Sequence, residues 1–238
     1  MLVAKAWVPL ALIFALGCTL RLLDFNHYWL NPDEGIYFSM VSWNEWSSFW
    51  NEYLGNAHPP LFYLLIRAMS GLADGIAPLR CVALVAGCCC VPVTFLFVRE
   101  CVSRDAIGTL AGLLAAALMA ISQTAVEMSQ IVRPYTLQIF AMTLGLFYLV
   151  RFMRRGGQRS LPLYAVWMTV ALLTHYGTVI VLAGVALTFF GLLAFRRLDG
   201  KQGGPSSCGT SHCSLSFWLC TSCTSGRISK GVPWPKMR

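Results

Sequence analysis

Two adjacent acids near the start of the chain are the first residues that could carry out chemistry. The motif reads Asn31-Pro32-Asp33-Glu34-x-x-Tyr37, and no lysine or arginine lies between Arg21 and Arg67. Carboxylates without basic neighbours could deprotonate an acceptor hydroxyl or hold a divalent cation such as Mg²⁺, Mn²⁺ or Zn²⁺. The motif also predicts a helix start, with Asn31 as cap and Glu34 completing a capping box. Acids that only complement a helix dipole therefore stay an open alternative.

Three further motifs place a histidine or an arginine at a predicted helix end. His58 precedes two prolines, and an imidazole there can ligate a metal or donate to a phosphate. Arg133 follows Ser129-Gln130 and precedes Pro134-Tyr135, where a guanidinium beside a helix N-terminus can bind an anion. The third motif is the turn Thr174-His175-Tyr176. Each has a structural alternative: a histidine satisfied within its turn, or an arginine whose head group reaches the membrane surface.

The composition requires that membrane helices position these motifs. Of 238 residues, 57% are apolar and 12% are charged, whereas about 25% of the residues in soluble domains are charged. Five runs carry no acid, lysine or arginine, covering residues 6–20, 81–98, 106–126, 134–150 and 160–195. The last run exceeds one crossing and is split at 174–177, which predicts about six transmembrane helices. The expected fold class is an all-α integral membrane protein, which excludes a soluble enzyme and disorder.

The positions of the basic residues predict the topology. The apolar run 59–72 contains Arg67 and is short for a crossing, so we expect it to lie flat on the outer surface. The basic clusters then fall on one side, the cytoplasm: Lys5, Arg99 and Arg104, Arg151 to Arg159, and Arg196 with Arg197. Residues 25–78 form an extracytoplasmic loop, whose aromatic residues recur at the spacing of amphipathic interfacial helices. This topology places all four motifs at one membrane face.

The two ends of the chain and its net charge have simpler interpretations than a binding function. The first run, 6–20, is predicted to be an uncleaved span, with a signal segment as the alternative. Residues 1–200 form the predicted membrane domain, and 201–238 form a polar Cys-, Ser- and Gly-rich tail that is expected to be unfolded. A zinc cluster in this tail is a weaker alternative. The net charge of +8 is explained by topology, so no nucleic-acid partner is expected.

In order and spacing, the four motifs resemble those of GT-C membrane glycosyltransferases of the protein mannosyltransferase and aminoarabinose transferase type. The resemblance covers about residues 5–200 and is closest to the bacterial branch, glycosyltransferase family 39. It implies a partial GT-C fold in the cell (inner) membrane. It also implies transfer of a sugar, with inversion, from a polyprenyl-phosphate donor to an acceptor glycan, lipid or protein at the extracytoplasmic face.

The resemblance also implies roles for individual residues. Asp33 would be the base, and Glu34 would assist it or bind a metal together with His58. The donor phosphate would be bound by Arg133, Tyr135 and His58. Further candidates for the site are Tyr37, Gln130, His175 and Tyr176. Many relatives have Glu-Ala where this chain has Ile131-Val132, so no acid acts at position 131.

Two alternatives to an active transferase remain. Relatives continue with more spans, so the chain is expected to be truncated, and it could be an inactive fragment of such an enzyme. A transporter subunit would need ionisable groups at mid-membrane depth. Residues 82–97 and 110–125, which are centres of predicted spans, contain no acid, lysine, arginine or histidine. This pattern favours chemistry at the membrane surface over transport.

Overall fold

A computed structural model describes residues 6–26, 30–42, 45–55 and 58–202, with side chains up to Ala194. All the regular secondary structure in these residues is helical, which confirms the all-α fold class. The helices are α2 (Trp7–Leu22), α3 (Pro32–Ser42), α4 (Trp46–Leu54), α5 (Pro60–Ser70), α6 (Ala77–Val102), α7 (Ala106–Ile121), α8 (Gln123–Ser129), α9 (Tyr135–Arg155), α10 (Ser160–Thr174) and α11 (Thr178–Gln202). Apart from 201–202, which end α11, the predicted tail lies outside the described residues.

Each of the six predicted spans corresponds to an apolar helix or to a bent pair of helices. By length and composition, α6 and α9 can each cross a membrane, and α7 with α8 adds a third span if the bent pair is counted as one. The other predicted spans are shorter apolar helices in the described residues: α2, α10 and residues 178–194 of α11. The run predicted to lie on the surface is α5, which has 11 residues.

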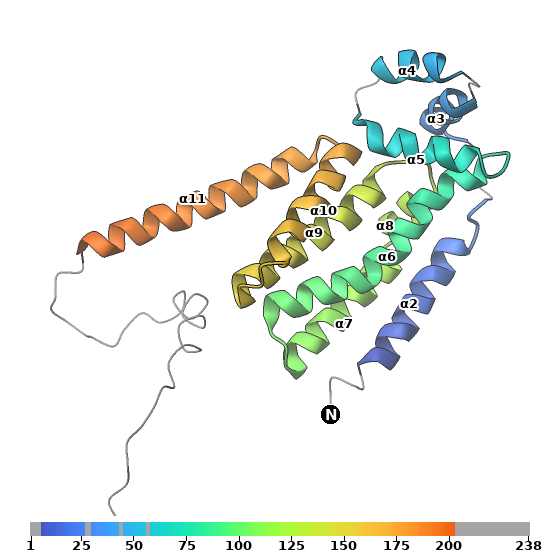
Figure 1. Cartoon of the computed structure of the whole chain (residues 1–238). Helices are drawn as coiled ribbons and strands as arrows, with labels where there is room; N and C mark the ends of the chain where they lie inside the picture. The colour runs from blue at the N-terminus through green and yellow to red at the C-terminus, as the bar shows by residue number, and fades with distance from the viewer. Residues whose placement is uncertain (1–5, 27–29, 43–44, 56–57, 203–238) are drawn as a thin grey trace, which may run out of the picture.

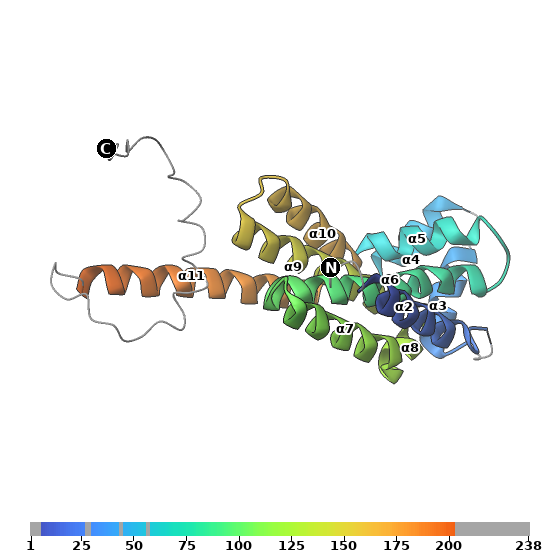
Figure 2. The ribbon, with the colours of Figure 1, turned by 90° about the horizontal axis from the view of Figure 1, so that it is seen from below.

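Helix α6 occupies the middle of the bundle and packs against α2, α7 and α9, while α10 packs on α9. Helices α3, α4 and α5 gather over one end of the bundle, near the start of α6 (Figure 1). We call this the α3–α5 end. Helix α11 contacts α10 near the α10–α11 turn and then runs away from α6 and α7 (Figures 1 and 2).

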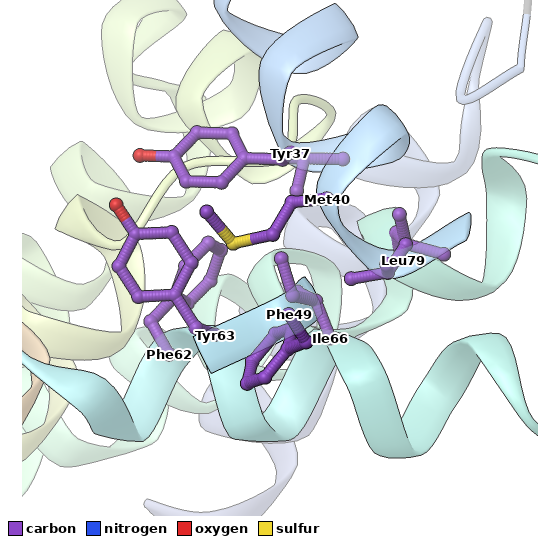
Figure 3. Close-up of a cluster of buried hydrophobic side chains, with 9 residues drawn as sticks. Tyr37, Met40, Phe49, Phe62, Tyr63, Ile66 and Leu79 are labelled. Carbon is purple, nitrogen blue, oxygen red and sulfur yellow. The ribbon is translucent and has the colours of Figure 1, made fainter. Parts of the chain in front are cut away.

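An apolar cluster attaches α3, α4 and α5 to the bundle (Figure 3). Its side chains come from these three helices, from the start of α6 and from the turn before α9. The buried members are Tyr37, Met40, Val41, Phe49, Phe62, Tyr63, Ile66, Leu79 and Val132. Burial of this many apolar side chains gives the loop before α6 a fixed position on the membrane helices.

The opposite end of α6 is held by an ion-pair network around Glu100, whose side chain is only 4% exposed. Arg155 of α9 donates to both carboxylate oxygens, at 2.7 and 2.6 Å. Arg104 donates from Nε to Oε2 at 3.2 Å. These arginines belong to the basic clusters that the sequence placed at the cytoplasmic side.

The predicted span over 106–126 is broken in the structure into two helices. Helix α7 ends at Ile121 and α8 begins at Gln123, with a bend of 59° between them. Ser122 caps α8 by accepting a hydrogen bond from the Ala125 N–H at 3.4 Å. The absence of charge across the run did not reveal this break, although the polar residues Ser122, Gln123 and Thr124 lie at it.

Arg21 of α2 stabilises the broken end of α7. Its guanidinium is fully buried and donates to the carbonyls of Met119 at 3.0 Å and Ala120 at 3.1 Å. Carbonyls in the last turn of a helix have no partner within that helix, so the guanidinium replaces the missing donors. Arg21 Nε also donates to Ser129 Oγ at 3.2 Å, which joins α2 to the end of α8.

The close approach of α8 to α6 depends on Gly87. A Cβ atom at this position would collide with the Ser129 side chain and come within 3.2 Å of Arg21 Nε. We therefore expect Gly87→Ala to lower the free energy of unfolding by about 1–3 kcal/mol, as other overpacked substitutions do. Thermal unfolding in detergent would measure the change. Gly184→Ala is the control, since its Cβ would meet nothing within 4 Å; equal melting temperatures for the two variants would contradict the expectation.

Candidate functional site

The predicted capping box forms at the start of α3. Asn31 Oδ1 accepts from the Glu34 N–H at 2.9 Å, and Glu34 Oε2 accepts from the Asn31 N–H at 3.3 Å. Pro32 is the first residue of the helix, as the sequence predicted. Asp33 and Glu34 thus lie in the first turn, where their different environments separate their roles.

Glu34 is fully buried and forms a two-point ion pair with Arg80 of α6. Arg80 donates from Nε to Oε1 at 3.0 Å and from Nη2 to Oε2 at 2.9 Å. Glu34 Oε1 also accepts from the Val132 N–H at 2.8 Å. Because both oxygens are engaged, Glu34 ties α3 to α6 and to the turn before α9.

Asp33 and Arg133 form a second ion pair, beside the buried one. Asp33 directly precedes Glu34, and Arg133 directly follows Val132, so the buried contacts of Glu34 hold both partners in place. The Asp33 side chain is 49% exposed and that of Arg133 is 23% exposed. The pair is therefore accessible to a substrate, whereas the Glu34–Arg80 pair is not.

The two predicted histidines meet next to this ion pair. The ring centroids of His58 and His175 lie 5.1 Å apart, and those of Tyr135 and His175 lie 5.2 Å apart. Burial lowers the pKa of His58 from its usual value, and electrostatic interactions with His175 and Arg133 lower it further. His58 thus stays neutral to a lower pH than a free imidazole does.

Tyr37 connects the ion pair to the apolar cluster. Its ring lies 5.5 Å from that of Tyr63, and both hydroxyl groups point to the same side of the cluster (Figure 3). Burial raises the pKa of Tyr37, and nearby Arg133 opposes this effect. The phenol therefore stays protonated and can donate a hydrogen bond at neutral pH.

Two of the predicted site residues, Gln130 and Tyr176, lie outside the group formed by the ion pair and the two histidines. Gln130 is buried, and its Nε2 donates to the carbonyls of Arg21 at 3.2 Å and Leu23 at 2.6 Å. It therefore holds the end of α2. Tyr176 is 56% exposed and lies close enough to Tyr53 of α4 to contribute, after burial, to the raised pKa of Tyr53.

Sequence reasoning missed Arg80 and Tyr63 as members of this region. The sequence did contain a signal for Arg80. In the predicted topology, Arg80 and Arg133 are the only arginines next to a span that lie near the outer side in the loops between spans. Tyr63 lies in the same short motif as His58, His58-Pro59-Pro60-Leu61-Phe62-Tyr63, but was assigned no role. Their importance depends on which side chains face Glu34 and Tyr37, and spacing along the chain does not reveal that.

The described part of the chain contains no cluster of side chains that would bind the predicted divalent cation. No group of three or more His, Cys, Asp or Glu side chains there could hold a metal ion. Glu34, one of the two predicted ligands, already uses both oxygens in contacts with Arg80 and Val132. The cation stays a prediction, and the chemistry below does not depend on it.

These features define a class of protein: an all-α membrane protein with an accessible acid–arginine pair at one end of its helices. Residues 57–202, more than half of the chain, match the family described as dolichyl-phosphate-mannose-protein mannosyltransferase. The chain belongs to this family, and it is thus a membrane glycosyltransferase of the GT-C type. The matched range includes His58, Arg133 and His175, while Asp33 and Glu34 precede it. No curated protein and no solved structure matches the chain.

The first prediction for this site concerns the buried ion pair. Arg80→Met removes the cation and leaves the Glu34 carboxylate buried, so we expect it to lower the free energy of unfolding by about 3–5 kcal/mol. Arg104→Met, at a side chain that is 56% exposed, is the control and should cost less than about 1 kcal/mol. Denaturant titration in detergent would measure both. A small loss for Arg80→Met would show that the ion pair does not anchor α3.

The second prediction concerns the charge around His58. Replacing Arg133 with glutamine removes a positive charge beside the imidazole, so the pKa of His58 should rise toward its usual value. NMR titration of histidine-labelled protein would follow it, with the His58 signal assigned by its loss in His58→Gln. Arg155→Gln, at the opposite end of the bundle, should leave the titration unchanged. An unchanged His58 pKa in Arg133→Gln would contradict the proximity of the two side chains.

Proposed function

We propose that the chain transfers a sugar from a polyprenyl-phosphate-linked donor to an acceptor hydroxyl at the extracytoplasmic face of the cell (inner) membrane, with inversion at the anomeric carbon. The observation that carries the proposal is the accessible Asp33–Arg133 ion pair at the α3–α5 end. Family membership supports a lipid-linked donor and an acceptor in a membrane. The acceptor class, whether glycan, lipid or protein, is left open.

The orientation is supported by the charges at the two ends of the bundle. Arg104 and Arg155 lie at the Glu100 end, and a cytoplasmic position for basic residues is the usual bias in membrane proteins. The α3–α5 end then faces outward. A lipid-linked sugar suits this side because its phosphate lies at the headgroup level, where a residue at the membrane surface can reach it.

In the proposed reaction, the acceptor oxygen attacks the anomeric carbon while Asp33 takes the proton of the hydroxyl group. The bond between the anomeric carbon and the phosphate oxygen breaks, and its electron pair stays on the phosphate. Attack from the face opposite the leaving phosphate gives inversion. Asp33 is suited to this role because its side chain is half exposed, and no hydrogen bond within the described residues engages its Oδ1 atom.

Arg133 would stabilise the charge that develops on the leaving phosphate. A guanidinium has five N–H donors, so Arg133 can bind a phosphate oxygen while it keeps its contact with Asp33. Tyr135 begins α9 two residues later, and its phenol is a second candidate contact. A preorganised cation stabilises the more highly charged transition state more than the ground state.

Glu34 has a positioning role in this proposal. Its carboxylate is buried against Arg80, so it cannot reach an acceptor without loss of that ion pair. It sets the position of Asp33 through the first turn of α3 and that of Arg133 through the Val132 N–H. His58 can donate a hydrogen bond to the phosphate as a neutral imidazole.

The test is a transfer assay on the whole chain reconstituted in lipid, with polyprenyl-phosphate sugars as donors and a mixed pool of acceptors. Asp33→Asn should lower kcat by about 100-fold or more, since it removes the base. Arg133→Gln should weaken both turnover and donor binding. Asp74→Asn changes an exposed acid in the α5–α6 turn, away from the ion pair, and is expected to keep native activity.

Each other outcome of this assay has a definite meaning. Donor binding without sugar release by the native chain would favour an inactive fragment of a transferase. No donor binding would contradict the site. Full activity of Asp33→Asn would exclude Asp33 as the base, and NMR of the product anomer would test inversion independently.

A further inference from the structure

The α10–α11 turn holds His175 in one orientation. The Gly177 N–H donates to His175 Nδ1 at 2.9 Å. The His175 N–H donates to the Ala171 carbonyl at 3.0 Å, and the His175 carbonyl accepts from the Thr178 N–H at 3.2 Å. Both the backbone and the ring of His175 are therefore fixed by hydrogen bonds within the turn.

Helix α9 fixes the same turn from the other side. Gln138 Nε2 donates to Thr178 Oγ1 at 3.1 Å, and both side chains are buried. Because Gln138 lies in the first turn of α9, this hydrogen bond sets the α10–α11 turn relative to Tyr135. The contact between the Tyr135 and His175 rings, at 5.2 Å, follows from this arrangement.

The hydrogen bond to Nδ1 determines which nitrogen of His175 carries the proton. A neutral imidazole has one N–H donor and one acceptor nitrogen. Since Nδ1 accepts from the backbone, the proton is on Nε2, and the ring presents Nε2–H as its only donor.

We propose that His175 is a catalytic residue whose Nε2–H donates a hydrogen bond to the leaving phosphate of the donor. The ring lies against His58 and Tyr135, two of the side chains assigned to the phosphate, and Arg133 is beside His58. The inference rests on the proposed function and adds a specific donor to it. His175 serves as a hydrogen-bond donor and transfers no proton.

The charges in this step balance. The donor phosphodiester carries one negative charge, and the leaving phosphomonoester carries two after the bond to the anomeric carbon breaks. The additional negative charge is matched by the acceptor proton, which goes to Asp33. Because the phosphate charge grows during the reaction, a fixed N–H donor stabilises the transition state more than the bound donor.

Gly177 is required for this arrangement. A Cβ atom on Gly177 would lie 2.9 Å from His175 Nδ1, 3.2 Å from Cε1 and 3.3 Å from Gln138 Nε2. The imidazole is the group that can rotate away, so an alanine at 177 would displace the ring while leaving His175 in the sequence. Gly177→Ala thus tests the orientation of His175 separately from its presence.

The experiment measures kcat and the donor dissociation constant separately for the full chain in lipid. His175→Ala should lower kcat by about 100-fold, the effect of removing one preorganised donor, while the donor dissociation constant changes by less than about threefold. His175→Gln retains an N–H donor at the end of its side chain and should recover part of the loss. Gly177→Ala should also lower kcat. Gly184→Ala, in helix α11 with open space around it, should have native activity.

A readout without turnover separates this inference from the proposed function. ¹⁵N NMR should show His175 with Nε2 protonated and Nδ1 unprotonated, and addition of polyprenyl phosphate should shift the Nε2–H signal downfield. Native kcat in His175→Ala, together with a loss of activity in Asp33→Asn, would overturn the inference and leave the proposed function standing. If the native chain releases no sugar, the proposed function fails. The absence of an Nε2–H shift would then overturn the inference as well.

Discussion

The candidate site depends on one buried ion pair, Glu34–Arg80. The two charges lie in a region from which water is excluded, so each is stable only while the other is present. Glu34 also receives the Val132 N–H, which brings together three segments far apart in the chain: the first loop, the start of α6 and the turn before α9. The ion pair of Asp33 with Arg133 forms at the surface because this buried contact holds both neighbours in register. The proposed base, Asp33, is thus positioned by the residue beside it.

Helix α6 carries a buried charge contact at each end, and this gives the bundle its geometry. Arg80 anchors the loop helices at one end, while Glu100 anchors α9 through Arg155 at the other. Between these contacts α6 packs through apolar and small side chains. A central helix anchored at both ends fits the proposed site for a sugar and a phosphate, since catalysis by preorganised charges requires that they move little during the reaction.

The sequence predicted the helices because hydrophobic runs and proline positions are visible in short stretches of the chain. It predicted that the motifs gather at one end because the charges of the loops can be added up on each side of the membrane. The start of α3 at Pro32, the shortness of helix α5 and the turn at His175 all agree with the prediction. The break at Ser122 was not predictable in this way, since it depends on Arg21 approaching from a helix about 100 residues earlier. The separation of Asp33 from Glu34 also escaped prediction, because burial of one acid and exposure of its neighbour depend on the position of Arg80. The roles of Asp33, Arg133 and His58 stay predictions.

The buried guanidinium of Arg21 has a consequence for the order of biosynthesis. Besides the Gly17 carbonyl of its own helix, its partners are the carbonyls at the end of α7 and the hydroxyl of Ser129, which lie 98 to 108 residues further along the chain. When α2 emerges from the ribosome these later groups do not yet exist, so the guanidinium has only the Gly17 carbonyl and the surrounding water or lipid headgroups as partners. Arg21 lies in the last turn of α2, where a long side chain can reach the membrane interface. Helix α2 can therefore take its final depth and packing only after α7 and α8 have entered the membrane. The bundle is thus completed only after these later helices are inserted.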